Sequence, residues 1–283
     1  MSIEAIFISQ KYEKNWISEN FQFLGLKTYF CIEKFLKMAL QESIEKQGNW
    51  LFKYRSFLPL IIFAPGLAWY IYLSYERGYV NPWWLDIIFL FVGFLGLAIR
   101  ILTVGFTPKG TSGRNTTEGQ VAETLNTSGI YSTVRHPLCL GNFFMWLAPV
   151  LMITDLWFAL FFCAFYWIYY ERIMYAEEGF LRKKFGNAYF DWAEKTPAFF
   201  PKFSNYRKSE LEFSIKNVLK REYNGFFNLI MIMTAFRVIA FLIVDEEFYL
   251  DLAWIIIFGA GFLIFAVLKI LKKFTKVLEV EGR

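Results

Sequence analysis

Residues 84–106 read WLDIIFLFVGFLGLAIRILTVGF, an almost uninterrupted apolar run. A helix of this length can cross a bilayer, whose hydrocarbon core requires about 20 residues. The whole chain shares this apolar character, since 56% of its 283 residues are hydrophobic and 21% are aromatic. Ordinary soluble domains contain less apolar sequence. The composition therefore predicts a multispanning membrane protein.

Further apolar stretches lie near residues 57–75, 138–153, 156–170, 226–244 and 252–268. The first and the last two are long enough to cross a bilayer. The two middle stretches are shorter and are separated only by a Thr-Asp pair, which predicts a tight helical hairpin. We expect an all-α, polytopic integral membrane bundle with about six membrane helices, including this short hairpin.

The polarity of the chain divides it into three expected parts. Residues 1–50 form a peripheral polar segment, and residues 51–205 form the membrane core. Residues 206–283 contain a membrane hairpin and a basic tail, preceded by an interfacial helix near 207–222, where apolar residues recur at helical spacing among lysines and arginines.

Basic residues are concentrated in the N-terminal segment, the loop 107–137, the segment 171–225 and the C-terminal tail. The opposite connections are neutral or acidic. By the positive-inside rule, both termini and the motif-bearing loops face the cytoplasm. This asymmetry explains the net charge of +5, so no nucleic-acid partner is expected.

Cys31, Cys139 and Cys163 are scattered, and the chain has one histidine. These residues cannot supply the clustered Cys and His ligands of a structural zinc site. We therefore expect no metal.

The only histidine lies in the sequence Arg135-His136-Pro137. Because Pro137 restricts the preceding residue, His136 is expected to be extended and Pro137 to begin a helix. Free amides and the helix dipole make such a start an anion site. Gly141, one turn later, permits close approach by a ligand or another helix. The alternative is a helix cap followed by a packing glycine.

Two glutamates follow, and they are predicted to differ. Glu177 shares a helical face with large apolar residues four, eight and twelve positions later. A carboxylate on an apolar face needs a cationic partner, which a bound organic cation would provide. Glu178 is placed to form a solvated pair with Arg182. Loss of Glu177 should therefore affect ligand binding more than loss of Glu178.

Together these features resemble the isoprenylcysteine carboxyl methyltransferase and phosphatidylethanolamine methyltransferase superfamily of integral membrane enzymes. One position departs from the family pattern: two residues after the proline, where the family usually has a tyrosine, this chain has Cys139. The departure affects an aromatic or hydroxyl contact to the cofactor. The matching stretch covers roughly residues 129–201 and reads Gly129-Ile130-Tyr131, Arg135-His136-Pro137, Gly141, Glu177-Glu178, Leu181, Phe185-Gly186, Tyr189, Pro197 and Pro201.

The resemblance implies an S-adenosylmethionine-dependent methyltransferase with Arg135, His136 and Glu177 as catalytic residues. The cofactor's carboxylate suits basic residues and helix amides, whereas its ammonium and ribose groups suit a glutamate. Its sulfonium suits aromatic faces such as Trp146, Tyr166 and Tyr169. Methyl transfer to an oxyanion mainly requires orientation and exclusion of water. The implied cofactor-binding residues are Tyr131, Arg135, His136, Pro137, Gly141, Glu177 and Glu178.

Three arginines are candidates for binding the acceptor. Arg114 lies in the polar loop 110–117, which resembles a phosphate cradle or a simple flexible turn. Arg100 and Arg237 lie within apolar stretches, where arginines pair with an anion or line a polar cavity. A structural pairing of Arg237 with a carboxylate such as Glu171 is the alternative.

Among members of the superfamily, the chain most resembles bacterial lipid A 1-phosphate methyltransferases. This resemblance implies a bacterial inner-membrane enzyme that O-methylates an anionic lipid headgroup drawn from the bilayer. The alternative enzymes methylate the amine of phosphatidylethanolamine or a prenylcysteine carboxylate. A non-catalytic membrane scaffold or transporter is the alternative of another class.

Overall fold

The computed structural model describes residues 40–55, 58–108, 111, 114–116, 119–280 and 282. Most of the peripheral segment predicted over 1–50, including Cys31, therefore lies outside the described residues. The chain divides into two compact units, Met1–Gln47 and Gly48–Arg283. Helix α3 (Leu40–Tyr54) begins in the first unit and ends in the second.

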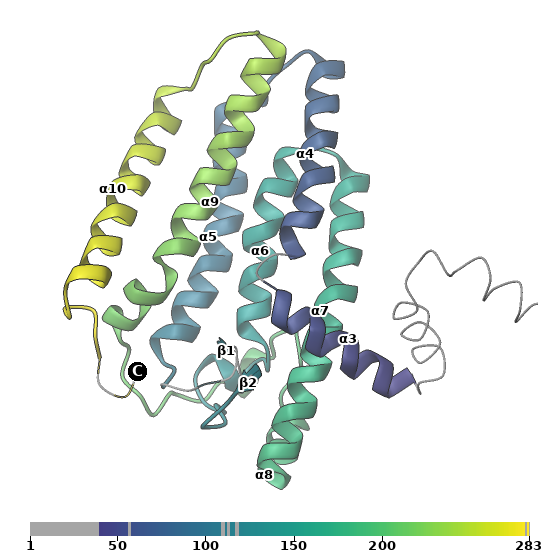
Figure 1. Ribbon diagram of the computed structural model, residues 1–283, viewed down its shortest axis with the longest axis vertical. Helices are drawn as coiled ribbons and strands as arrows, with labels where there is room; N and C mark the ends of the chain where they lie inside the picture. The colour runs from purple at the N-terminus through teal and green to yellow at the C-terminus, as the bar shows by residue number, and fades with distance from the viewer. Residues whose placement is uncertain are drawn as a thin grey trace, which may run out of the picture. The chain divides into compact units, whose positions relative to one another are not determined.

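The second unit is a helical bundle in which α5, α6 and α9 pack against one another and α10 packs against α9 (Figure 1). The expected helical architecture is present. The exception is a short antiparallel hairpin of β1 (Arg114–Thr116) and β2 (Gly119–Val121), located in the polar loop before α6. The helices are α4 (Leu58–Arg77), α5 (Trp83–Gly105), α6 (Pro137–Met152), α7 (Leu156–Phe185), α8 (Asn187–Ala193), α9 (Ile215–Val244) and α10 (Leu252–Phe274), with 3-10 turns η1 (Ile130–Ser132) and η2 (Phe203–Asn205).

Three of the described helices, α5, α9 and α10, are long and apolar enough to cross a membrane. They coincide with three of the stretches expected to do so, and they suggest a membrane protein. Helices also form at the other three apolar stretches, but α6 is shorter. The count of six crossings therefore stays a prediction.

The α6–α7 hairpin forms where the sequence predicts it. Asp155 caps α7 by accepting a 2.6 Å hydrogen bond from the Phe158 amide. Arg77, the last residue of α4, donates to the Thr154 hydroxyl at 2.6 Å and to the Ile153 carbonyl at 3.0 Å. These bonds satisfy polar groups at the turn, as a short loop beside apolar helices requires.

Two glycines allow α5 and α6 to pack closely. A Cβ on Gly96 would collide with the Gly141 carbonyl, and a Cβ on Gly141 would lie 2.8 Å from the Gly96 carbonyl. Helix pairs this close need small residues at the contact. Gly141 therefore acts as a helix-packing residue, and the contact brings the first turns of α6 beside Arg100 of α5.

The interfacial helix expected over 207–222 is wrong in its extent. Residues 207–214 are not helical, and the following residues are the first turns of the continuous helix α9. Ser214 is the N-cap and accepts from the Asn217 amide. The preceding backbone pairs with other segments instead, because Gly129 donates to the Arg207 carbonyl and Ser214 donates to the Gly105 carbonyl.

Candidate functional site

A polar cavity of about 580 Å³ lies among α5, α6, α7 and α9 and reaches the end of α10. Its volume falls within the range of about 300–1,000 Å³ that is typical of ligand sites. It contains basic, acidic, amide and aromatic side chains. The residues predicted for the site that line it are Arg100, Tyr131, Arg135, His136, Pro137 and Glu177.

The His-Pro sequence positions the start of α6. Pro137 is the first helical residue, as expected, and His136 is the N-cap. His136 is not helical, but its φ of −120° and ψ of 61° also differ from the expected extended conformation. The amides of Arg135 and His136 donate to the carbonyls of Pro197 at 2.9 Å and Ala198 at 3.1 Å. The segment after α8 therefore holds the motif from outside the helix.

The first turn of α6 lies at the edge of the cavity. Leu138 and Cys139 both line it. Amides in a first helical turn lack an intrahelical acceptor, and the helix dipole makes this end favourable for an anion. A carboxylate can therefore be held there by the backbone.

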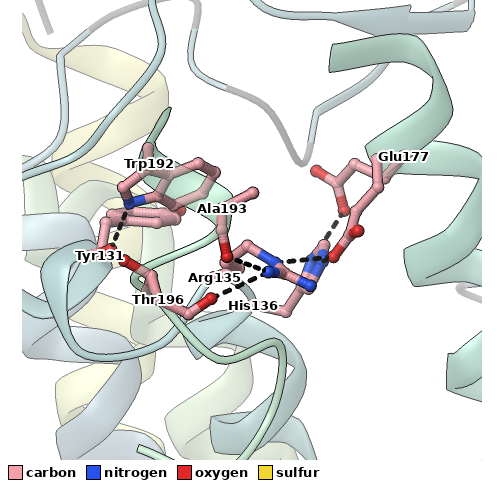
Figure 2. Close-up of polar contacts among 8 residues, drawn as sticks. Tyr131, Arg135, His136, Glu177, Trp192, Ala193 and Thr196 are labelled. Atoms are coloured by element: carbon pink, nitrogen blue, oxygen red, sulfur yellow. Dashed lines mark hydrogen bonds and ion pairs between the residues drawn. The ribbon is translucent and has the colours of Figure 1, made fainter. Parts of the chain in front are cut away.

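His136 lies between two carboxylates (Figure 2). Its Nε2 is 3.0 Å from Oε1 of Glu178, and its Nδ1 is 3.5 Å from Oε2 of Glu177. Burial opposes protonation of the ring, but the hydrogen bonds and charges of the two glutamates outweigh it and raise the pKa of His136 to about 9. The ring is therefore an imidazolium at neutral pH.

Arg135 supports this arrangement (Figure 2). Its Nε donates to Glu178 at 2.9 Å, and its Nη1 donates to the carbonyls of Ala193 at 2.7 Å and Thr196 at 2.8 Å. Two of its nitrogens are thus occupied by the protein. Arg135 lines the cavity, but these bonds make it chiefly a positioning residue for Glu178 and for the α8 segment.

The expected pairing of Glu178 with Arg182 does not form. Glu178 instead contacts Arg135 and His136, and Arg182 lies over the ring of Phe190 with its guanidinium carbon 5.6 Å from the centroid. Burial opposes ionisation of Glu178, but the hydrogen bond and charge of His136, with the charge of Arg135, lower its pKa to about 2. Glu178 therefore pairs with Arg135 and His136, which are distant in sequence, rather than with Arg182 four residues later on the same helix.

The apolar face that follows Glu177 is interrupted. Gly186 ends α7 with φ +53°, a left-handed conformation that glycine adopts without strain. Tyr189 therefore belongs to α8 rather than α7. It still packs with Leu181 in one buried cluster, which also contains Tyr131.

Arg100 is held by residues that the sequence analysis did not single out. Its guanidinium forms a fork with Glu222 of α9 at 2.7 and 2.9 Å, and it donates to Asn142 of α6 at 2.6 Å. Asn142 in turn donates to the Tyr170 hydroxyl at 3.3 Å. Glu222 could have been found from the sequence, because it is a carboxylate just before the apolar part of α9 and Arg100 lies in another apolar stretch that needs an anionic partner.

The aromatic residues proposed to face a sulfonium are distributed over two cavities. Trp146 and Tyr170 line the polar cavity, and both also line an adjoining apolar cavity with Tyr166 and Tyr169. The Tyr166 hydroxyl donates to the Cys139 carbonyl at 2.6 Å. An aromatic hydroxyl from α7 thus reaches the position where the family's usual tyrosine is absent.

Arg237 lies away from this cavity. It is 2% exposed and donates to Asp86 at 2.6 Å, to the Asn81 carbonyl at 2.9 Å and to Asp251. It follows Glu222 by 15 residues of the same helix, which corresponds to about 22 Å along the axis. Glu171 is not its partner among the described contacts.

Two other predicted site residues that the structure describes also lie outside the cavity lining. Gly141 packs against α5, and Glu178 lies behind His136. Arg114 begins β1, but its side chain lies outside the described part of the structure.

Comparison with known proteins links the central part of the chain to methyltransferases. Residues 88–188 match the phospholipid methyltransferase family. The nickel-cobalt-cadmium resistance protein NccN of Alcaligenes xylosoxydans xylosoxydans is 31% identical over 124 residues, which are 44% of this chain and 55% of that protein. The cobalt-zinc-cadmium resistance protein CzcN of Cupriavidus metallidurans is also 31% identical over 124 residues, which are 44% of this chain and 54% of that protein.

The chain thus spans about half the length of the curated relatives it matches. No solved structure matches it significantly. The segment that matches the family contains all of α6 and α7 and most of α5, and therefore also His136, Glu177 and Glu178. This match supports a relationship between the central part of the chain and the methyltransferase superfamily.

Proposed function

We propose that this chain is an S-adenosylmethionine-dependent methyltransferase that O-methylates an anionic lipid headgroup, with the 1-phosphate of lipid A as the acceptor. The observation that carries the proposal is the position of the His136 ring, held between Glu177 and Glu178 at the start of α6 in a polar cavity beside apolar helices. The phospholipid methyltransferase match over the same residues supports it.

The residues around the cavity fit the charges of the cofactor. The α6 amides at Leu138 and Cys139 would hold its carboxylate, and Glu177 would hold its ammonium or ribose hydroxyls. The rings of Trp146 and Tyr170 would face the sulfonium. When bound, the cofactor supplies an activated methyl group.

The protonation states favour an oxyanion as the acceptor over an amine. An amine must lose a proton to attack, which requires a base near neutral pH. His136, with a pKa of about 9, is already protonated, and Glu178, with a pKa of about 2, is a weak base. A phosphate or carboxylate oxygen needs no such base, so the protonation states of these two residues suit an anionic headgroup, whereas an amine acceptor would depend on another carboxylate such as Glu177.

A third cavity, distinct from the one lined by Tyr166 and Tyr169, supports an acceptor with acyl chains. It lies between α6 and α9, has a volume of about 200 Å³ and shares Arg100, Asn142 and Trp146 with the polar cavity. Met145, Pro149, Leu229 and Ile232 also line it, so its surface is largely apolar. A headgroup in the polar cavity could therefore be continuous with a chain among the membrane helices. By the positive-inside rule, we place the polar cavity and both termini on the cytoplasmic face of a bacterial inner membrane.

Two experiments test this function. Calorimetry of the detergent-purified protein should show binding of S-adenosylmethionine and of its demethylated product, and absence of binding under several lipid conditions would favour a scaffold or transporter. Incubation with methyl-labelled cofactor and bacterial lipid extracts, followed by mass spectrometry, should identify a methylated phospholipid or lipid A. A methylated amine or prenylcysteine would overturn the acceptor assignment.

A further inference from the structure

On the side formed by α9 and α10, the polar cavity is lined by basic residues that are not among the proposed cofactor-binding residues. Lys220 and Arg221 come from α9, and Lys272 comes from α10. The Lys272 ammonium donates to the Lys220 carbonyl at 3.0 Å, so the two lysines lie beside each other. We call Lys220, Arg221 and Lys272 the basic wall.

The basic wall gives the cavity an excess of positive charge. Glu177 and Glu222 are the carboxylates in its lining, and they already face His136 and Arg100. Among the described residues, neither Lys220 nor Lys272 lies within 4.0 Å of a carboxylate oxygen. Several like charges that line one concave surface concentrate a potential that attracts an anion. The six lysines and arginines of the lining are Arg55, Arg100, Arg135, Lys220, Arg221 and Lys272.

We propose that the basic wall binds the phosphate of the acceptor lipid. This inference rests on the proposed function and assigns the substrate-binding residues within it. Lysine ammonium groups bind phosphate as mobile point charges. The cofactor's carboxylate does not need them, because its proposed binding site is the start of α6. The phosphate would thus occupy the α9 and α10 side of the cavity, and the cofactor would occupy the α6 and α7 side.

The shared chemistry is a phosphate, and the neighbouring cavity favours a lipid as its source. The cavity between α6 and α9 adjoins the polar cavity through Arg100, Asn142 and Trp146 and offers an apolar surface for a chain. Free phosphate would gain nothing from that surface. A phosphate attached to acyl chains should therefore bind more tightly than inorganic phosphate.

Lysines near helix ends also bind anionic membrane surfaces without forming a site. Lys216 of α9 and Lys273 of α10 provide a matched control for this effect. They lie on the same two helices, are exposed and are absent from the cavity lining. Lys216→Ala/Lys273→Ala removes the same charge as Lys220→Ala/Lys272→Ala.

The experiment measures binding of dihexanoyl phosphatidic acid, dihexanoyl phosphatidylcholine and inorganic phosphate to the full-length protein in a neutral detergent. We expect Lys220→Ala/Lys272→Ala to weaken phosphatidic acid binding about tenfold, because two charges facing the phosphate are lost. The control variant should stay within about twofold of the wild type. Lys220→Arg/Lys272→Arg should retain most of the binding, which separates the loss of charge from misfolding.

Equal weakening in the control variant would overturn the site in favour of general surface attraction. Inorganic phosphate binding as tightly as phosphatidic acid would overturn the lipid assignment. Affinity for S-adenosylmethionine, measured on the same samples, separates the two proposals. If the protein binds the cofactor but Lys220→Ala/Lys272→Ala leaves phosphatidic acid binding unchanged, only the role of the basic wall is refuted. If that variant weakens phosphatidic acid binding as expected but the protein binds no cofactor, only the methyltransferase function is refuted.

Discussion

The Nε2 atom of His136 lies 3.0 Å from a carboxylate oxygen of Glu178, although 42 residues separate the two along the chain. Glu177 approaches the other ring nitrogen at 3.5 Å. One imidazolium thus ties the start of α6 to the C-terminal third of α7. The contact between the start of α6 and α7 beside the polar cavity therefore depends on the charge of the His136 ring.

The first prediction concerns pH. The pKa of His136 is raised from 6.5 to about 9, so its stabilisation is complete below about pH 6.5 and is lost as pH rises through about 9. We expect the free energy of unfolding to fall by on the order of 3 kcal/mol across that window. Denaturant unfolding in detergent at pH 6.5 and 9.5 measures this, and the His136→Gln variant should lack the dependence. An equal loss in that variant would assign the effect to other groups.

The two glutamates should separate in a second experiment. Glu178→Gln leaves Arg135 and His136 without their shared anion, so it should destabilise the fold by about 2–4 kcal/mol. Glu177→Gln should instead weaken S-adenosylmethionine binding about tenfold with a smaller loss of stability. Calorimetry and denaturant unfolding on the same preparations measure both quantities. The reverse order of effects would contradict the roles that the geometry indicates.

Arg100 and Glu222 should behave as a coupled pair. Glu222→Met leaves the Arg100 guanidinium without its carboxylate and should cost about 3 kcal/mol, because an uncompensated charge remains near the membrane helices. The Arg100→Met/Glu222→Met double variant should recover much of that loss. A double-mutant cycle on unfolding free energies gives the coupling, and additive single effects would show that the fork contributes little.

Arg237 should prove structural. Its contacts with Asp86, Asp251 and the Asn81 carbonyl join the ends of α5, α9 and α10. Arg237→Ala should therefore lower folded yield and cost about 3–5 kcal/mol of stability. Arg237→Lys should restore the stability only partly, because one ammonium cannot reproduce the contacts of the planar guanidinium with Asp86, Asp251 and the Asn81 carbonyl.

If the proposed function holds, the folded protein in the Arg237→Ala preparation should have a normal KM for its lipid and normal cofactor affinity. A raised KM with unchanged stability would instead place Arg237 at the substrate.

Local chemistry was sufficient to predict several features from the sequence. Hydropathy located the apolar part of each long helix in the described residues from α4 onward, because the length of an apolar run and the solvent it requires are properties of the run alone. It missed the polar turns that extend α7 to Phe185 and begin α9 at Ile215. The helix start at Pro137 and the non-helical conformation of His136 follow from the proline ring, whereas the ψ of 61° at His136 does not. The tight turn at Thr154-Asp155 follows from the short gap between two apolar stretches.

Only the tertiary structure decided which charges meet. Glu178, Arg100 and Arg237 find partners on other helices, at sequence separations of 42 to 151 residues for Glu178–His136, Arg100–Glu222 and Arg237–Asp86. A helical pattern specifies which residues share a face, but it does not specify the rotation of that helix against its neighbours. That rotation turns Glu178 toward α6 rather than toward Arg182. The packing of α9 and α10 likewise brings Lys220 and Lys272 together at the cavity, a proximity that no spacing along the chain encodes.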